Sequence, residues 1–339
     1  MKNFPNVSII IPAHNAQATL RLCLESVIKL DYPKDSLEVI LVDNNSTDST
    51  KEIARSYTVT VLREENVQSS YAARNRGIQH AKGEILAFTD TDCIVSPDWL
   101  KKLLTSRSDP EVGCFAGNIV SYKPQTLAEQ YADRDDENHN QLRCLTVGYL
   151  PYAQTANVAY RKVVFEDIGL FNAKFKSGGD VDFTWRMLKH GKFKIVYEPE
   201  AIVYHKHRTS VSGLYRQNRK YGESITDLMK LYPDSCTDTF WFFTDIFHHF
   251  FLGLKTFPGN LFRYYRGEIS RIDIWVHFLK ALCRTGFVVG RIRAQGRKEN
   301  GTISGIRVVS YFLITSIIRC KGLLQHLKAT LSHENSSCK

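Results

Sequence analysis

The sequence predicts an α/β fold, in which a mostly parallel central sheet flanked by helices is followed by a basic, helical C-terminal extension. Apolar runs of strand length alternate with helical stretches between Val7 and Thr89, a pattern typical of parallel strands joined by helical crossovers. From residue 201 onward 21 Lys and Arg stand against 9 Asp and Glu, whereas residues 1–200 carry 24 against 26. These observations predict a sheet-based domain with an appended basic region.

Each predicted element has its own local signal. The first strand is Val7–Ile11, an apolar run that Pro12 ends, so a loop follows directly. The second strand, Leu37–Asp43, is apolar up to its acidic end, and the polar turn after it offers N-caps for another helix. The remaining elements of this half are helices near 18–28 and 68–80 and strands at 58–62 and 84–89.

Acidic side chains end two of these strands. Asp43 closes the second strand, and Asp90 and Asp92 follow the strand at 84–89. The carboxyl ends of parallel strands line the ligand crevice of such a sheet, where Asp43 could accept hydrogen bonds from a base or ribose. The paired aspartates offer oxygen ligands for a divalent cation that bridges to a diphosphate. Taken alone, Asp-Thr-Asp at a strand end is more commonly a polar turn that caps backbone amides.

Four segments resemble the successive signatures of the family 2 glycosyltransferases, in the family's order and spacing. They are Ser8-Ile-Ile-Ile-Pro-Ala-His-Asn15, Val42-Asp-Asn-Asn-Ser-Thr-Asp48, Ala72-Ala-Arg-Asn-Arg-Gly77 and Asp90-Thr-Asp92. The resemblance implies the GT-A nucleotide-diphospho-sugar transferase fold, which is Rossmann-like, together with a divalent cation and transfer of a sugar with inversion. It extends over roughly residues 5–225.

The resemblance assigns the donor side residue by residue. It places the nucleotide loop on Pro12, Ala13 and Asn15, and the donor-base contact on Asp43. It places the diphosphate-side arginine on Arg74 and the metal motif on Asp90 and Asp92. The cation would be Mn²⁺ or Mg²⁺. His14 departs from the pattern, because the family more often has an aromatic residue there.

The acceptor half continues the resemblance, and Asp180 matches the family's general base. Inversion by direct displacement requires one carboxylate to take the proton of the acceptor hydroxyl. Gly179 stands where many members have Glu, so Asp182 is the competing candidate. A carboxylate near a helix N-terminus is also favoured by the helix dipole, which is the commoner reason for an acid at the position of Asp182.

Two further segments carry predicted site residues. A strand at 194–197 and another at 201–205, on either side of Pro199, lead to His205, which by resemblance lies beside the metal and diphosphate; His207 is the fallback. Neutral imidazole suits Mn²⁺ better than Mg²⁺. The segment from Arg216 resembles the family's Gln-x-x-Arg-aromatic motif, which places acceptor contacts on Gln217, Arg219 and Tyr221. The same basic helix could equally be solvated.

The C-terminal half combines its positive charge with aromatic helices. The apolar segments begin at Phe240, Trp275 and Val308, and none reaches the roughly 18 consecutive apolar residues of a spanning helix. Such helices could lie on an anionic membrane surface, or pack on the catalytic domain or on a second subunit in a homodimer. The predicted boundaries are a donor half at 1–120, an acceptor half at 121–232, and the extension at 233–339.

Composition completes the prediction. The 8 cysteines include no Cys-x-x-Cys pair, so neither a zinc site nor a disulfide framework is indicated, and no signal peptide is evident. We expect a cytoplasmic glycosyltransferase, peripheral on the inner face of the membrane, that moves a sugar from a nucleoside-diphosphate donor, favouring UDP, to a glycan or lipid-linked acceptor in cell-surface polysaccharide synthesis. A nucleotidyltransferase of related fold is one alternative, but it would need a Gly-rich loop after the first strand to hold a triphosphate, and Pro12-Ala-His-Asn15 is not such a loop. A basic protein that only binds nucleic acid or membrane is the other alternative, although no nucleic-acid partner is expected.

Overall fold

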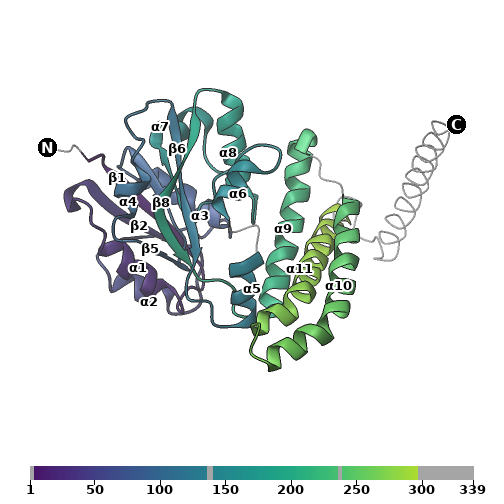
Figure 1. Ribbon diagram of the computed structural model, residues 1–339. Helices are drawn as coiled ribbons and strands as arrows, with labels where there is room; N and C mark the ends of the chain where they lie inside the picture. The colour runs from purple at the N-terminus through teal and green to yellow at the C-terminus, as the bar shows by residue number, and fades with distance from the viewer. Residues whose placement is uncertain (1–3, 136–139, 236–238, 297–339) are drawn as a thin grey trace.

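The computed structural model describes residues 4–135, 140–235 and 239–296, except the side chains of residues 135 and 239–242. A single mixed sheet forms the centre, with strand order β3-β2-β1-β4-β7-β6-β8-β5 (Figure 1). The strands are β1 Val7–Ala13, β2 Leu37–Asp43, β3 Thr60–Arg63, β4 Ile85–Phe88, β5 Cys93–Val95, β6 Val112–Ser121, β7 Val158–Arg161 and β8 Lys194–His205.

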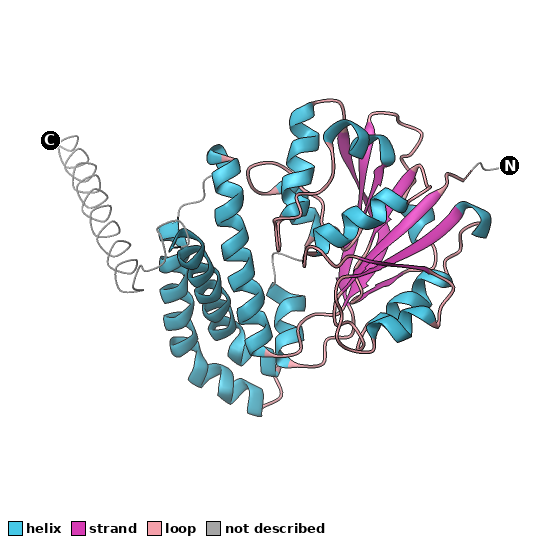
Figure 2. Ribbon diagram, turned by 180° about the vertical axis from the view of Figure 1, so that it is seen from behind, coloured by secondary structure: helices cyan, strands magenta, loops and turns pink. Residues whose placement is uncertain are grey.

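Helices cover both faces of the sheet and form a separate layer beside it (Figure 2). In the sheet-containing part they are α1 Leu20–Ile28, η1 Lys34–Ser36, α2 Thr50–Arg55, α3 Ser70–His80, α4 Trp99–Leu103, α6 Gln141–Thr146, α7 Lys162–Ile168 and α8 Gly179–His190. The lateral layer contains α5 Leu127–Asp135, α9 Val211–Leu231, η3 Pro233–Ser235, α10 Thr239–Tyr265 and α11 Arg271–Gly296.

The parallel part of the sheet is buried on both faces, which explains the continuous apolar runs of β1 and β2. Ile9 and Ile11 point into the core shared with α1 and α4, whereas Ile10 points into the core shared with α3 and α8. Strands β3, β2, β1 and β4 run parallel. Their carboxyl ends therefore share one edge, as predicted.

The other half of the sheet differs in one respect from the prediction of two short strands around Pro199. The segment forms one long strand, β8, whose register with the parallel strand β6 jumps from Gly117 opposite Glu198 to Asn118 opposite Ile202. The extra residues of β8 bulge at Pro199, which lacks the amide proton that a regular ladder requires. The strand then continues to His205, which the antiparallel partner β5 holds opposite Cys93.

The lateral layer has its own small core, formed where α5, α9 and α11 meet. Leu214 of α9 packs there with Tyr131 of α5 and with Ile272 and Leu279 of α11. Helix α10 lies on the outer side of α11, away from the sheet (Figures 1 and 2). The domain boundary after Tyr232 stays a prediction, although α9, which precedes it, already packs on α11. No helix among the described residues has both the length and the apolar content needed to span a membrane. The apolar run that begins at Val308 lies outside the described residues.

Candidate active site

The loop after β1 and the turn after β2 are held together at the carboxyl edge of the sheet. The His14 Nδ1 atom is 2.8 Å from the Asn44 carbonyl oxygen. The Asn15 amide donates to Ser46 Oγ at 3.0 Å, while Asn15 Oδ1 accepts from the Thr47 amide at 2.8 Å. Both Asn15 and Asn45 adopt positive φ, a conformation that asparagine tolerates better than most residues. Pro12 and Ala13, the other predicted nucleotide-loop residues, are buried in β1 and position Asn15.

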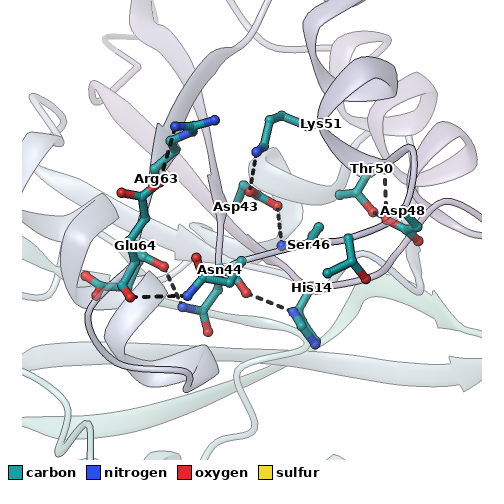
Figure 3. Close-up of polar contacts among 12 residues, drawn as sticks. His14, Asp43, Asn44, Ser46, Asp48, Thr50, Lys51, Arg63 and Glu64 are labelled. Atoms are coloured by element: carbon teal, nitrogen blue, oxygen red, sulfur yellow. Dashed lines mark hydrogen bonds and ion pairs between the residues drawn. The ribbon is translucent and has the colours of Figure 1, made fainter.

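Asp43 lies at the floor of this edge with only 2% of its surface exposed. Its Oδ1 accepts from the Ser46 amide at 3.3 Å, and its Oδ2 is 3.7 Å from Lys51 Nζ (Figure 3). Lys51 belongs to the first turns of α2, which Asp48 anchors by accepting from the Thr50 amide at 3.0 Å. The Asp43 carboxylate and the Lys51 ammonium group therefore meet where the sequence predicted a contact with the nucleotide base. Lys51 was not part of that prediction.

Asp92 and His205 are brought together by the pairing of β5 with β8. The distance from Asp92 Oδ1 to His205 Nε2 is 3.6 Å, and Arg208 Nη1 lies 4.0 Å from Asp92 Oδ2. Burial acts to raise the pKa of Asp92, but the His205 imidazole and the Arg208 guanidinium outweigh it and the pKa is lowered. Single ligand atoms of Asp92, Cys93 and His205 all lie within 4.8 Å of one another. Burial raises the pKa of the Cys93 thiol well above its ordinary value, so Asp92 and His205 are the better metal ligands.

Asp90 points to a different partner. Its Oδ1 accepts from Arg74 Nη2 at 2.5 Å, and Arg74, 3% exposed, also lies over the Tyr71 ring with its Cζ atom 5.3 Å from the centroid. Both cation and aromatic ring come from α3, whose residues 71 and 74 share one face. The predicted metal motif is thus divided in this structure, with Asp92 beside His205 and Asp90 beside Arg74.

Asp180, at the start of α8, joins this cluster from the opposite side. Its Oδ1 accepts from the Tyr71 hydroxyl at 3.0 Å and from the Val181 amide at 3.1 Å, and its Oδ2 accepts from the Thr155 amide at 3.5 Å. Burial raises the pKa of Asp180 despite the opposing effects of Arg74 and of these hydrogen bonds. A carboxylate with a raised pKa is a stronger base, as a proton acceptor requires.

The absence of a side chain at Gly179 has a geometric cause. A Cβ atom built on Gly179 would lie 2.8 Å from the Cδ2 and Cε2 atoms of Tyr71, which is too close for real contacts. The Tyr71 ring therefore occupies the space that a side chain at position 179 would take. Gly179, which stands where many family members have Glu, thus makes room for the Tyr71 ring.

The contacts of Asp182 hold elements of the fold together. It is buried, and its carboxylate binds Arg186 Nε at 3.0 Å and accepts from the Tyr232 hydroxyl at 2.8 Å. Arg186 continues to the carbonyl oxygens of Ile168 and Leu170. The carboxylate of Asp182 is thus engaged in holding α8 to the loop after α7 and to the end of α9.

The three predicted acceptor contacts on α9 do not share one face. Gln217 Nε2 donates to the Tyr221 hydroxyl at 2.9 Å, and Leu228, further along this side of the helix, packs against Gly178. Arg219 is about 200° around the helix from Gln217. Its carbonyl oxygen lies against Gly290 of α11, so Arg219 is placed at the contact between the two helices.

Comparison with known proteins decides what this arrangement belongs to. Residues 8–169 match the sequence model described as "Glycosyl transferase family 2". Over 222 residues the chain is 36% identical to glycosyltransferase AglE of Haloferax volcanii, an alignment that covers 63% of this chain and 71% of that protein. The chain belongs to glycosyl transferase family 2. It is an enzyme that transfers a glycosyl group, which confirms the family predicted from its motifs.

Other similarities agree with the assignment of this family 2 glycosyltransferase. It is 25% identical over 231 residues to dolichyl N-acetyl-alpha-D-glucosaminyl phosphate 3-beta-D-2,3-diacetamido-2,3-dideoxy-beta-D-glucuronosyltransferase of Methanococcus voltae, covering 64% of this chain and 71% of that one. It spans about half, 48%, of the length of the pre-mycofactocin glycosyltransferase of Mycobacterium tuberculosis. The fold matches that of mannosyltransferase PcManGT from Pyrobaculum calidifontis, solved with GDP-Man and Mn²⁺, with a TM-score of 0.56 at 16% identity over 93% of this chain and 81% of that one. The predicted GT-A fold is thereby confirmed.

Sequence reasoning missed three side chains of the glycosyltransferase's candidate site. Tyr71 and Lys51 gave no local signal, because each becomes relevant only through a partner distant in the chain. Arg208 could have been found, since it follows His205 and His207 directly after the end of a strand that points to the site. All three stand within hydrogen-bonding or ion-pairing distance of a predicted site carboxylate.

Proposed function

We propose that this family 2 glycosyltransferase takes a sugar from a nucleoside-diphosphate donor and transfers it with inversion to an acceptor hydroxyl. UDP is the favoured nucleotide of the donor. The observation that carries the proposal is the row of contacts from Asp90 through Arg74 and Tyr71 to Asp180. This row links the end of β4 with the start of α8. A donor at the strand ends would therefore lie between the diphosphate-binding groups and the half-buried carboxylate of Asp180.

A divalent cation fits the chemistry of Asp92 and His205. A carboxylate oxygen and an imidazole nitrogen 3.6 Å apart favour Mn²⁺ over Mg²⁺. The PcManGT structure, which shares the fold, was solved with Mn²⁺. When bound, the cation would neutralise charge on the departing diphosphate. Arg74 and Arg208 would hold the remaining phosphate oxygens, and Asp43 with Lys51 would contact the nucleoside.

Asp180 would take the proton of the attacking hydroxyl. Because Tyr71 and two backbone amides donate to its two oxygens, the carboxylate is oriented before the acceptor arrives. It is half-buried, and this partial desolvation raises its pKa, which strengthens it as a base. Gln217 and Tyr221, on the α9 face towards Gly178, would contact the acceptor.

We place the acceptor among glycans or lipid-linked precursors of cell-surface polysaccharides. The basic C-terminal half suits a membrane-bound substrate, and the Methanococcus voltae relative is named for a dolichyl-linked sugar phosphate. A cytoplasmic location, on the inner face of the membrane, agrees with the buried cysteine thiols of the described residues. The extension beyond Tyr232 would then serve as membrane or dimer contact.

The metal role is tested with Asp92→Ala. We expect Mn²⁺ to raise the thermal stability of the wild-type protein in the presence of UDP, because a ligand that binds the native state stabilises it. Asp92→Ala should abolish this Mn²⁺-dependent increase and the transfer of sugar. Asp98→Ala, which changes an aspartate before α4 outside the site, is the control. UDP affinity that is unaffected by chelator in the wild-type protein would disprove the metal role.

The base is tested by comparing Asp180→Asn with Asp182→Asn. Asp180→Asn should lower kcat by about 10²- to 10⁴-fold, the usual contribution of a positioned base, while donor affinity stays within a few-fold. Asp182→Asn should mainly lower the free energy of unfolding, because it weakens a buried ion pair. Near-normal turnover in Asp180→Asn, together with an inactive but stable Asp182→Asn, would require the two roles to be exchanged.

A further inference from the structure

Helix α10 carries a row of exposed apolar side chains that no described element covers. We propose that this row, the α10 stripe, is the surface by which the protein docks onto an anionic lipid bilayer. Its members are Phe247, Phe251, Leu254, Phe262 and Tyr265, which are 60%, 61%, 50%, 63% and 80% exposed. The inference is independent of the proposed catalytic roles.

The spacing of the stripe defines one continuous helix face. Intervals of three, four and eight residues keep these side chains on one side of the helix. Pro258 lies inside α10 between Leu254 and Phe262, and the stripe follows the bend of the helix (Figure 1). The opposite side of α10 packs on α11, where Gly253 and Phe257 contact Phe278. The stripe therefore faces outward, on the helix that lies furthest from the sheet among those the structure describes (Figure 1).

The charge beside the stripe is positive. Lys255 and Arg266 are exposed along one flank, and Glu268, just after the helix, pairs with Arg266 at 3.0 Å and with Arg263 at 3.5 Å. Three cations thus stand beside one acid. The one acidic residue in the α10 sequence, Asp245, is turned away and accepts from Arg284 Nε at 2.7 Å. Aromatic side chains beside an excess of cations over acids are typical of helices that lie in the headgroup region of an anionic membrane.

Two other occupants fit this charge less well. A second copy in a two-fold interface would bring two positively charged flanks near each other, because Glu268 offsets only one of the cations beside each stripe. The chain's own residues 297–339 contain 7 Lys and Arg against 2 Asp and Glu, so they too would add positive charge. Anionic lipid complements both the stripe and the net charge of the C-terminal half.

The test is co-sedimentation of the full chain with vesicles, without donor or metal. Vesicles of phosphatidylglycerol mixed with phosphatidylcholine are compared with phosphatidylcholine alone. The variants are the triple substitution Phe247→Ser, Phe251→Ser and Phe262→Ser, and the single substitution Lys255→Gln. The matched control is Leu22→Ser with Leu231→Ser, which removes two exposed apolar side chains outside α10.

We expect the wild-type protein and the control to bind the mixed vesicles and the triple variant to lose at least about tenfold in partitioning. Lys255→Gln should weaken binding only to the mixed vesicles. Equal binding by the triple variant and the wild type, or no binding by the wild type, would overturn the proposal. Loss of vesicle binding on truncation after Gly296 would also overturn it. So would the finding that the wild-type protein is a dimer that binds no vesicles and that the triple substitution converts to monomers.

Discussion

Asp180 and Asp182 show how strongly surroundings determine the chemistry of identical side chains. Both lie in the first turn of α8. Asp182 is neutralised by Arg186 and hydrogen-bonded by Tyr232, so its carboxylate is fully used in the fold. Asp180 receives only neutral donors directly, and its pKa is raised by burial. This difference supports Asp180 as the base that the family resemblance predicted.

At the residue scale, Tyr71→Phe should shift the pH dependence of transfer. The Tyr71 hydroxyl stabilises the ionised form of Asp180, so its removal should raise the pKa of Asp180 further. The acid limb of kcat/KM should then move to higher pH, while the rate on the plateau and the affinity for donor change little. A pH profile measures the shift. Tyr57→Phe, which removes a hydroxyl bonded to Glu25 far from the site, is the control, and an unmoved acid limb would contradict this role of Tyr71.

At the scale of elements, the contact between α9 and α11 depends on glycines that allow the two backbones to touch. A Cβ atom on Gly222 would lie 1.9 Å from the Phe287 carbonyl oxygen, and one on Gly290 would lie 2.0 Å from the Arg219 carbonyl oxygen. Neither position can carry a side chain unless the helices separate. This close crossing fixes the position of α9, and with it Gln217 and Tyr221.

Gly290→Ala should therefore destabilise the protein. Forcing a methyl group into a packed contact typically costs about 1–3 kcal/mol, and the free energy of unfolding should fall by that amount in a denaturant titration. Gly259→Ala in α10 is the matched control, because nothing lies within 4 Å of a Cβ at that position. The control should be neutral or up to about 1 kcal/mol more stable, since alanine is the better helix former. Equal effects of the two substitutions would disprove the close-packing argument.

At the scale of the whole molecule, the lateral helices are packed into the enzyme and are not a detachable tail. Leu214 of α9 is buried against Ile272 and Leu279 of α11, and Arg134 of α5 pairs with Asp273 at the start of α11. Removing α10 and α11 would expose this core. The face of α9 on which the acceptor contacts are proposed is thus held from behind by α11.

Truncation after Tyr232 should consequently lower the melting temperature by roughly 10 °C or more, because several large apolar side chains lose their cover. Truncation after Gly296 keeps the described lateral core and should melt close to the full chain. Differential scanning calorimetry of the two forms makes the comparison. A Tyr232 truncation that melts like the full chain would show that the sheet-containing part is independent, as the predicted domain boundary implies.

Local sequence patterns were sufficient for the fold class, the family and the order of the donor-side motifs. Strands buried on both faces must be apolar throughout, so Val7–Ile11 and Leu37–Asp43 were recognisable without any partner. Parallel pairing then places their ends at one edge, which is why Asp43, Asp90 and Asp92 could be assigned together. The roles of these side chains remain predictions until the variants are measured.

Tertiary structure alone decided which side chains meet. The sequence could not show that β5 would place Cys93 opposite His205, that Tyr71 would take the space beside Gly179, or that Arg219 would face α11. Such contacts depend on strand register and on how helices cross, both of which are set by packing between distant segments. The sequence by itself determined a family 2 glycosyltransferase with a basic C-terminal half. The packing determined which carboxylate became the half-buried base candidate and which became part of the scaffold.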